Sequence, residues 1–360
     1  MKFIEMASPV IEAEEFEAVA RVLKTGILTQ GDKVAEFEES FRSLVGSDYA
    51  CAVNSGTSAL HVGLLASGLT NGDEVIVPSF TFAASANSIA LTGATPIFID
   101  VDINSYCLDD TKLESLITPR TRGVMPVHLY GNPANMTNIM KIASKHNIEV
   151  YEDAAQSHGA EHQGKPVGTF GKFAAFSFYP TKNITAVEAG MVMTSDESLL
   201  RKIKILRNQG MIERYVHELV GLNYRLSEVH AAIGVVQVKK LEKFNSIRKS
   251  LALTYDSELK NLITPFVPKG NRHVYHQYTI RTPGHDREKV VELLLNKGIK
   301  TGVYYPRPTH SQPAYGLDVD LPNTNILCRE VLSLPIHPKL TTADQEYIVE
   351  ELNKITSAGS

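Results

Sequence analysis

The chain has 360 residues, of which 43% are hydrophobic and 21% charged, and its formal net charge at pH 7 is -4. This length suits one large domain with a smaller one, and the composition is that of an ordinary globular protein. No basic arm stands out and no apolar run approaches the length of a membrane span, so the composition argues against nucleic-acid-binding and membrane-spanning classes.

The cysteines and the N-terminus indicate the cellular compartment in which the protein works. Cys51, Cys107 and Cys328 lie far apart and lack Cys-x-x-Cys spacing, so we expect reduced thiols and no bound metal. The N-terminus turns acidic where a signal peptide would need an apolar run. These features predict a cytoplasmic protein.

Short apolar runs alternate with helix-like stretches between about residues 48 and 196. The runs are YACAV, EVIVPS, TPIFIDVD, RGVMPVHLY, IEVYEDAA, FAAFSFYP and GMVMTSD. This rhythm predicts an α/β fold with a mostly parallel sheet and helices on both faces. Ligands bind at the carboxyl ends of such strands, so the turns that follow the runs are candidate sites.

The first two strands end in turns that suit a phosphorylated aromatic ligand. In NSGTSAL, the backbone N–H groups of Gly56 and Thr57 would face a phosphate at a helix start, and the Ser177 hydroxyl would add a donor. The alternative is that Gly56 serves only the backbone conformation of the turn. After PSFT, the ring of Phe82 would stack on a flat cofactor, whereas core packing is the ordinary role of Phe.

The fifth and sixth strands end near an acid and a lysine. Asp153 ends IEVYEDAA, with a helix cap as the alternative role, and Lys182 follows in SFYPTKN, with a solvated charge as the alternative. Gln156 and His158 read first as turn side chains. An acid and a lysine at neighbouring strand ends are what pyridoxal phosphate requires, because the carboxylate keeps the pyridine nitrogen protonated while the amine binds the cofactor and moves a proton. The pair predicts that cofactor, with both residues catalytic.

The rest of the chain predicts a second, smaller unit. Residues 197 to 249 read as helical with a break at 208–225 and a new helix start at Ser227. Beyond residue 250 we expect a helix, then the strand HQYTIRT, the helix DREKVVELLLNKG, the strands TGVYYP and LSLPIHP, and a helix from Thr341. The predicted division is a large domain over residues 1–249 and a small α+β domain over residues 250–360.

With NSGTSALH, DAAQSHGA, SFYPTKN and GLNYRLSEVHAAIG in one order, followed by YYPRPTHSQPAY and LSLPIHP, the chain resembles the DegT/DnrJ/EryC1/StrS family of sugar aminotransferases. The resemblance implies a fold type I pyridoxal-phosphate-dependent transferase that forms a homodimer with sites at the subunit interface. It also implies that glutamate donates an amino group to a 3- or 4-keto hexose on UDP, dTDP or GDP. The product would be an amino sugar for a glycan or a natural product.

The same match implies roles for individual residues. Lys182 would be the Schiff-base lysine and Asp153 the partner of the pyridine nitrogen. Gln156 would neighbour the ring hydroxyl, and Asn223 would reach the phosphate in the partner subunit. The other implied cofactor contacts are the stacking ring of Phe82 and the phosphate ligands Gly56, Thr57 and Ser177.

The chain departs from the family after the lysine, where a Gly-acid-Gly-Gly run is common and VEAG stands at residues 187–190. Valine at a position that favours positive φ would be strained, so the loop is expected to take another path. For the Tyr-rich loop at 304–315 the alternative is plain packing between domains. The substrate-site candidates are Glu188, Arg225, Tyr305 and His310.

Two other functions stay open. One is transamination of a cyclic ketone that carries no nucleotide, such as an inosose or another aminocyclitol precursor. The other is a regulatory protein that keeps a pyridoxal phosphate pocket without catalysis. Lys182 and Asp153 are both present and no DNA-binding segment is appended, which argues against the regulatory function.

Overall fold

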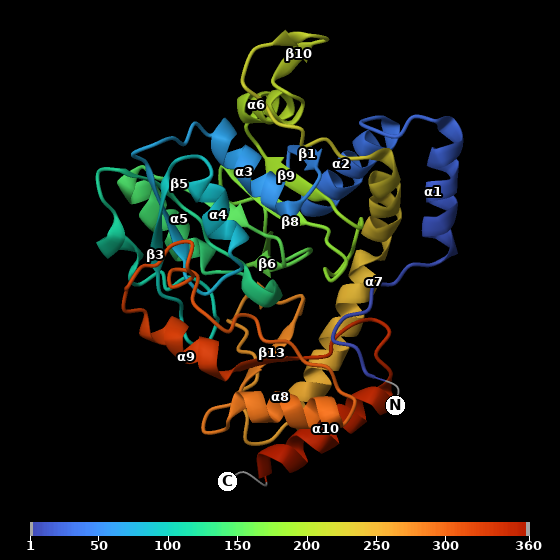
Figure 1. Cartoon of the computed structure of the whole chain (residues 1–360), viewed down its shortest axis with the longest axis vertical. Helices are drawn as coiled ribbons and strands as arrows, with labels where there is room; N and C mark the ends of the chain where they lie inside the picture. The colour runs from blue at the N-terminus through green and yellow to red at the C-terminus, as the bar shows by residue number, and fades with distance from the viewer. Residues whose placement is uncertain (1–2, 358–360) are drawn as a thin grey trace.

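The computed structural model describes residues 3–357, and a seven-stranded sheet lies at its centre (Figure 1). The strand order is β1-β9-β8-β5-β4-β2-β3. Strands β3, β2, β4, β5 and β8 pair in parallel, and β9 runs antiparallel to both β1 and β8. The strands are β1 (Tyr49–Val53), β2 (Glu74–Pro78), β3 (Thr95–Ile99), β4 (Thr121–Val124), β5 (Glu149–Asp153), β8 (Phe173–Ser177) and β9 (Gly190–Thr194).

Each of the seven predicted runs supplies one strand, which confirms the predicted α/β fold with a mainly parallel sheet. Strands β2 and β9 are buried at all five positions, as expected when helices cover both faces of a sheet. Side chains alternate between the faces with period two. In β1, Ala50 and Ala52 pack in the same cluster as Phe37 and Phe41, while Cys51 and Val53 pack in the cluster on the other face.

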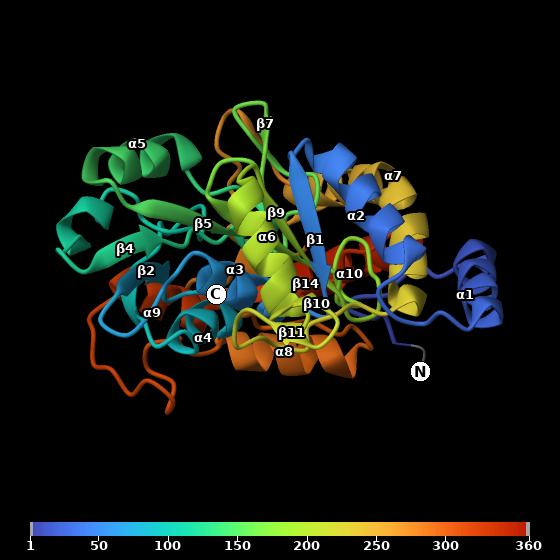
Figure 2. The same ribbon diagram turned by 90° about the horizontal axis from the view of Figure 1, so that it is seen from above.

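Helices cover both faces of the sheet. Figure 2 shows α2 and α5 on one side and α3 and α4 on the other. The helices around the sheet are α2 (Asp32–Val45), α3 (Gly56–Ala66), α4 (Ala84–Ala90), α5 (Met136–His146) and α6 (Glu197–Arg207), with 3-10 turns at η1 (Leu113–Leu116) and η2 (Leu129–Gly131). Helix α1 (Ala13–Thr25) lies further from the sheet and packs on α7 (Glu228–Glu258).

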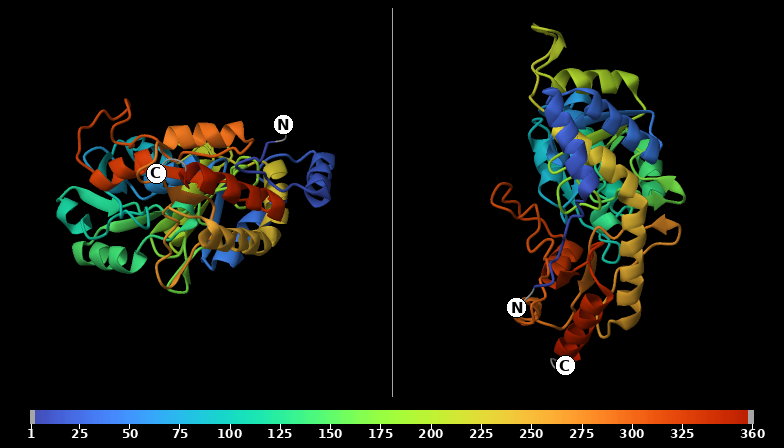
Figure 3. Two further views of the ribbon diagram at one scale, coloured as in Figure 1. Left: turned by 90° about the horizontal axis from the view of Figure 1, so that it is seen from below. Right: turned by 90° about the vertical axis from the view of Figure 1, so that its right-hand side faces the viewer.

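A 31-residue helix, α7 (Glu228–Glu258), connects the region of the sheet to the C-terminal part of the chain, and Figure 3 shows its whole length from the side. Its start agrees with the predicted helix start at Ser227, whose hydroxyl caps the first turn. The predicted domain boundary at residues 249/250 falls within α7 and stays a prediction.

The C-terminal part is built on a two-stranded antiparallel sheet with its own apolar core. The predicted strand at 301–306 is wrong. Only Gly302 bridges to Ser333 there, because Pro306 and Pro308, which follow closely, have no N–H to donate to a ladder. The elements of this part are β13 (Tyr278–Arg281), α8 (Arg287–Asn296), α9 (Pro322–Glu330), β14 (Val331–Leu334) and α10 (Thr342–Ser357).

Smaller strands complete the fold. The predicted break at 208–225 contains a hairpin, β10 (Met211–Glu213) with β11 (Val216–His217), which projects from the sheet region (Figure 1). A three-stranded ribbon consists of β12 (Asn271–Arg272), β6 (Glu161–His162) and β7 (Lys165–Pro166).

All three cysteines are free and buried. Within residues 3–357, no helix combines the length and hydropathy that crossing a bilayer requires.

Candidate active site

A buried carboxylate ends the central strand β5. Asp153 lies next to Ala175 of β8 in the parallel register, and its side chain is 5% exposed. Its Oδ2 accepts a hydrogen bond from the Ser85 hydroxyl (2.7 Å), and its Oδ1 accepts one from the backbone N–H of Ala155 (3.1 Å). The chain turns after β5 without starting a helix, so the helix-cap alternative does not apply and the carboxylate is free to face a ligand.

Lys182 lies beyond the carboxyl end of the neighbouring strand β8. Its backbone N–H donates to the Tyr179 carbonyl (2.9 Å) in a tight turn. Burial lowers the pKa of its amine from 10.5 to about 8, although the negative charge of Asp153 acts in the opposite direction. A large fraction of the amine is therefore neutral near pH 8 and can act as a nucleophile, unlike a solvated surface lysine.

The N-terminus of α3 lies against β8 at the same edge of the sheet. Gly56 is the first residue of α3, and a Cβ there would lie 2.6 Å from the Cβ of Ser177. Close approach therefore requires this glycine, and the alternative of a special backbone conformation does not apply. A Cβ on Gly190 would lie 2.0 Å from the Ser55 carbonyl oxygen. The packing brings helix N–H groups and the Ser177 hydroxyl together, which suits a phosphate.

An exposed aromatic ring lies at the same edge. The side chain of Phe82 is 60% exposed, so its ring does not pack in the core, and its centroid lies 6.0 Å from that of Tyr305 at a tilt of 35°. Gln156 donates from Nε2 to the Tyr305 hydroxyl (3.3 Å) and accepts through Oε1 from the Tyr130 N–H (2.7 Å). Phe82, Gln156 and Tyr305 are thus joined in one group.

These side chains fit pyridoxal phosphate. The cofactor needs an amine for its aldehyde, an anion beside its pyridine nitrogen, a flat apolar neighbour and N–H donors for its phosphate. The amine of Lys182, the carboxylate of Asp153, the ring of Phe82 and the N-terminus of α3 supply these four features. The charge of Asp153 acts on the Lys182 amine, which is consistent with both groups serving one site.

The predicted residues of the GLNYR segment lie close to the start of α3. The carbonyl of Asn223 accepts from the Asn54 side chain (3.4 Å), two residues before Gly56, while the Asn223 residue is exposed. Arg225 donates to the Asn208 side chain (3.0 Å). The exposed Asn223 amide is therefore available to a second molecule.

The remaining substrate-binding candidates, Tyr305, His310 and Glu188, lie in different parts of the structure. Tyr305 belongs to the group around Phe82, whereas His310 is 3% exposed and its Nδ1 is 2.7 Å from the Ser79 hydroxyl at the end of β2. Glu188 is exposed at the tip of the loop after Lys182. Only Tyr305 of these three contacts a predicted cofactor residue among the contacts given for residues 3–357.

The loop after the lysine keeps the backbone that favours glycine. Val187 has φ of 63°, so the expectation of another path is wrong at this position. The Thr185 hydroxyl accepts from the Val187 N–H (3.0 Å) and donates to the Phe178 carbonyl (3.0 Å). These bonds fix the turn, and a β-branched residue in this conformation is strained by about 1–3 kcal/mol.

Two residues that contact the site were missed or set aside in the sequence. Ser85 was not singled out, although it lies three positions after Phe82, because a serine at a helix start reads first as a cap. His158 lies between Phe41, Phe176 and Phe178, and burial together with the charge of Lys182 lowers its pKa to about 3. It is a neutral neighbour of the lysine.

Comparison with known proteins gives concordant matches. Residues 9–353 match the model of the DegT/DnrJ/EryC1/StrS aminotransferase family. A "GDP-perosamine synthase" from Caulobacter vibrioides is 39% identical over 98% of each chain, and a "Pleiotropic regulatory protein" from Geobacillus stearothermophilus is 37% identical over 95% of this chain and 94% of its own. The solved structure of S. venezuelae DesV with a ketimine intermediate superimposes with a TM-score of 0.92 at 38% identity, covering 96% of this chain and 94% of DesV.

Proposed function

Because the chain belongs to the DegT/DnrJ/EryC1/StrS aminotransferase family, and is therefore a sugar aminotransferase that uses pyridoxal 5'-phosphate, we propose that its substrate is a keto-sugar nucleotide. The substrate would be a 3- or 4-keto hexose on UDP, dTDP or GDP, with glutamate as amino donor. The observation that carries the transamination chemistry is the buried Asp153 carboxylate, whose charge acts on the Lys182 amine of lowered pKa. The proposed substrate class is supported by relatives such as the "GDP-perosamine synthase", which is 39% identical.

The charged Asp153 and the neutral Lys182 would have different roles in the reaction. Bound pyridoxal phosphate supplies an electron sink for the electrons of a broken C–H bond. The Asp153 carboxylate, which two donors hold in place, would keep a proton on the pyridine nitrogen. The neutral Lys182 amine would move a proton between the substrate carbon and the cofactor carbon C4'.

The substrate would approach from the side of the exposed groups. Phe82 and Glu188 are exposed, and Tyr305 lies beside Phe82. Burial raises the pKa of the Tyr305 hydroxyl, so this group stays protonated and is a hydrogen-bond donor to a sugar oxygen. We place Tyr305 on the substrate side, and Glu188, Arg225 and His310 remain substrate-binding candidates.

The second subunit would complete the site in a homodimer. Asn223 is exposed and its segment touches the start of α3, so a partner molecule placed there would meet its amide. The neighbouring hairpin region carries exposed apolar side chains, with Val220 99% and Tyr215 77% exposed. Exposed apolar groups that adjoin a site are common at subunit interfaces.

The second candidate substrate is a cyclic ketone that carries no nucleotide. A single experiment separates it from the first. The cofactor-loaded protein is treated with glutamate, freed of excess glutamate, and offered UDP-, dTDP- and GDP-linked keto-hexoses and an inosose in separate reactions. Mass spectrometry then identifies the amine.

Amination of a nucleotide-linked sugar at a rate at least tenfold above that of the inosose is the expected result. Lys182→Ala should abolish it, while Lys260→Ala, an exposed lysine in the C-terminal part, should leave it intact. Amination of the inosose alone would contradict the proposed nucleotide-linked substrate and support the cyclic ketone instead. If glutamate leaves the visible absorbance unchanged but another amino acid bleaches it, the donor is wrong.

A further inference from the structure

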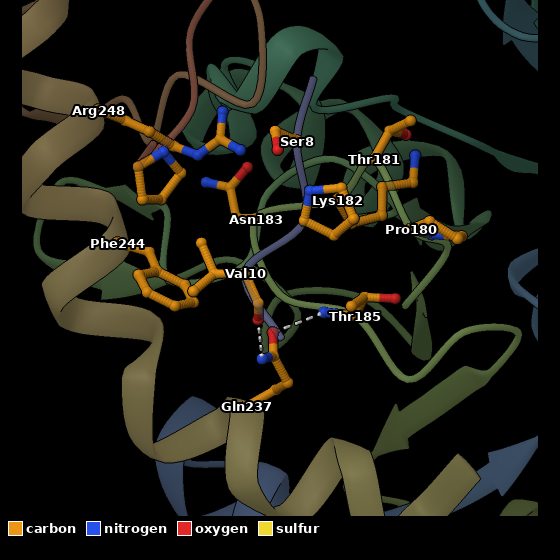
Figure 4. Close-up of a pocket in the computed structure, with 12 residues that line it drawn as sticks. Ser8, Val10, Pro180, Thr181, Lys182, Asn183, Thr185, Gln237, Phe244 and Arg248 are labelled. Carbon is orange, nitrogen blue, oxygen red and sulfur yellow. Dashed lines mark hydrogen bonds between the residues drawn. The ribbon is translucent and has the colours of Figure 1, made fainter. Parts of the chain in front are cut away.

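A small cavity lies behind Lys182, between the loop that carries this lysine and helix α7. Figure 4 shows the side chains around it. Its volume is ≈ 10 Å³, the room needed for about one water molecule. The residues used below that line it are Ser8, Lys182, Asn183, Arg248 and Pro338.

The first polar wall of the cavity is a buried guanidinium. Arg248 of α7 is 3% exposed, and its Nη1 donates to the carbonyls of Tyr275 (3.2 Å), His276 (3.2 Å) and Ile336 (2.7 Å). Its Nε–H has no partner, and within residues 3–357 the guanidinium forms no ion pair. Burial lowers its pKa to about 10, which leaves it charged at neutral pH. A buried donor on a charged group is costly to leave unpaired.

The second polar wall is the residue directly after the lysine. Asn183 is 3% exposed, and its Nδ2 donates to Asn245 Oδ1 (2.7 Å) and to the Val274 carbonyl (2.9 Å). Its Oδ1 has no partner. In Figure 4 the Asn183 amide lies beside the Arg248 guanidinium, with Ser8 on the same side of the cavity. Arg248 and Asn183 therefore both line one water-sized space, and each has a buried polar atom without a partner.

We propose that this cavity holds one ordered water, which accepts from Arg248 Nε–H and donates to Asn183 Oδ1, and that Arg248 is thereby a positioning residue for Lys182. The inference rests on the proposed role of Lys182 as the lysine that binds the cofactor. Arg248 then joins three segments, since it binds carbonyls at 275–276 and 336 directly and the lysine loop through the water. A chloride or bromide ion fits less well, because each is larger than a water molecule and the cavity has room for about one water.

The network keeps solvent away from the lysine. The titratable groups that act on Lys182 or respond to it are Asp153 after β5, His158 in the turn that follows, and His276 in the segment that Arg248 binds. Burial and nearby positive charge lower the pKa of both histidines, so they are neutral. Asp153 is thus the charged group that favours the protonated amine, and burial of Lys182 away from bulk water opposes it.

A crystal structure of the cofactor-loaded full chain, at a resolution that shows ordered waters, tests the site itself. One density peak should lie about 3 Å from both Arg248 Nε and Asn183 Oδ1. A direct bond between these two atoms would contradict the proposal, and so would an anomalous peak at this place after a bromide soak. Neither result depends on which substrate the enzyme uses, so this test can fail while the proposed function stands.

Substitution tests the positioning role. Arg248→Met should let water reach the lysine, and the pH midpoint of the long-wavelength absorbance of the loaded enzyme should rise by about half a unit or more, because hydration favours the charged form. Arg248→Lys should recover only part of the change, because an ammonium cannot reproduce the Nε–H geometry.

Arg287→Met is the matched control. Arg287 is also buried and donates to two carbonyls, those of Cys328 and Val331 (both 3.2 Å), but it lies on α8. This variant should lower thermal stability without moving the absorbance midpoint. Equal midpoints in the wild-type, Arg248→Met and Arg287→Met proteins would show that Arg248 is only structural.

Discussion

At the residue scale, the lowered pKa of Lys182 makes the stability of the fold depend on pH. Its amine has a pKa of about 8 in the fold against an ordinary value of 10.5, so the unfolded chain binds this proton more tightly. Below pH 8 both states are protonated and burial of the charge destabilises the fold by its full amount. As the pH rises from 8 towards 10.5, the folded state loses the proton first and the penalty disappears.

Lys182→Met should therefore stabilise the cofactor-free chain at pH 7. We expect the free energy of unfolding to rise by about 1–3 kcal/mol, a range that allows for the partial exposure of the side chain. The gain should shrink as the pH approaches 10, which urea unfolding at several pH values measures. Lys260→Met, at an exposed position, is the control. A gain that does not depend on pH would show that apolar packing, and not charge burial, is responsible.

At the scale of elements, one carboxylate of α7 satisfies the backbone at the start of α2, in addition to the apolar packing between the two helices. Glu228, the first residue of α7, accepts from the N–H groups of Gly31 (2.8 Å), Lys33 (2.9 Å) and Val34 (2.9 Å) at the start of α2. The N-cap of α2 is Gly31, which has no side chain to accept these bonds. A side chain from another helix therefore caps α2, and its negative charge interacts favourably with the helix dipole.

Glu228→Gln should lower the free energy of unfolding by about 1–3 kcal/mol, because a neutral amide has one acceptor oxygen for three donors and places an NH2 group against the others. Glu197→Gln is a suitable control, since Glu197 is an exposed residue in the first turn of α6. Guanidinium unfolding followed by circular dichroism measures both. Equal losses in the two variants would mean that the contact with α2 is unimportant.

The sequence predicts what is encoded locally and misses what depends on pairing between distant segments. The seven strands follow from apolar runs, and the joint location of Asp153 and Lys182 follows from strand ends. The antiparallel direction of β9 does not follow, because a buried strand has the same apolar pattern in either direction. The start of α7 at Ser227 was predictable from a local cap, whereas the contact of Glu228 with residues 31–34 joins positions nearly two hundred residues apart.

The same limit applies to the site. Ser85 and Arg248 act through bonds to residues far away in the sequence, and nothing next to them reports those partners. The strand predicted at 301–306 is the opposite kind of error, in which the local sequence suggests an element that the fold does not form. The composition of this segment is typical of a strand, but only Gly302 pairs with another segment. The positive φ of Val187 was expected to be avoided, but the bonds of Thr185 and Phe178 hold it.

At the scale of the whole molecule, the exposed apolar side chains of residues 208–225 lead us to predict a homodimer. If residues 208–225 pack on a second copy, the wild-type protein should sediment as a dimer at micromolar concentration. The double variant Tyr215→Ser, Val220→Asp should sediment as a monomer, because it removes apolar area from the interface and places a charge there. Analytical ultracentrifugation measures this shift.

Leu295→Asp provides the control for the assembly. Leu295 is 47% exposed on α8, which lies at the end of the molecule opposite the hairpin (Figure 1). It should leave the dimer intact. A wild-type protein that sediments as a monomer, or a double variant that stays dimeric, would contradict the proposed interface.

The unbroken course of α7 also restricts how chain length can vary between related proteins. Inserting one residue in the middle of an α-helix turns everything beyond it by about 100° and moves it by about 1.5 Å. Such an insertion in α7 would swing Arg248 away from the three carbonyls it binds and rotate the whole C-terminal sheet. Insertions and deletions should therefore be excluded from residues 228–258 and collect in exposed connections outside the proposed interface, such as the loop at 311–320.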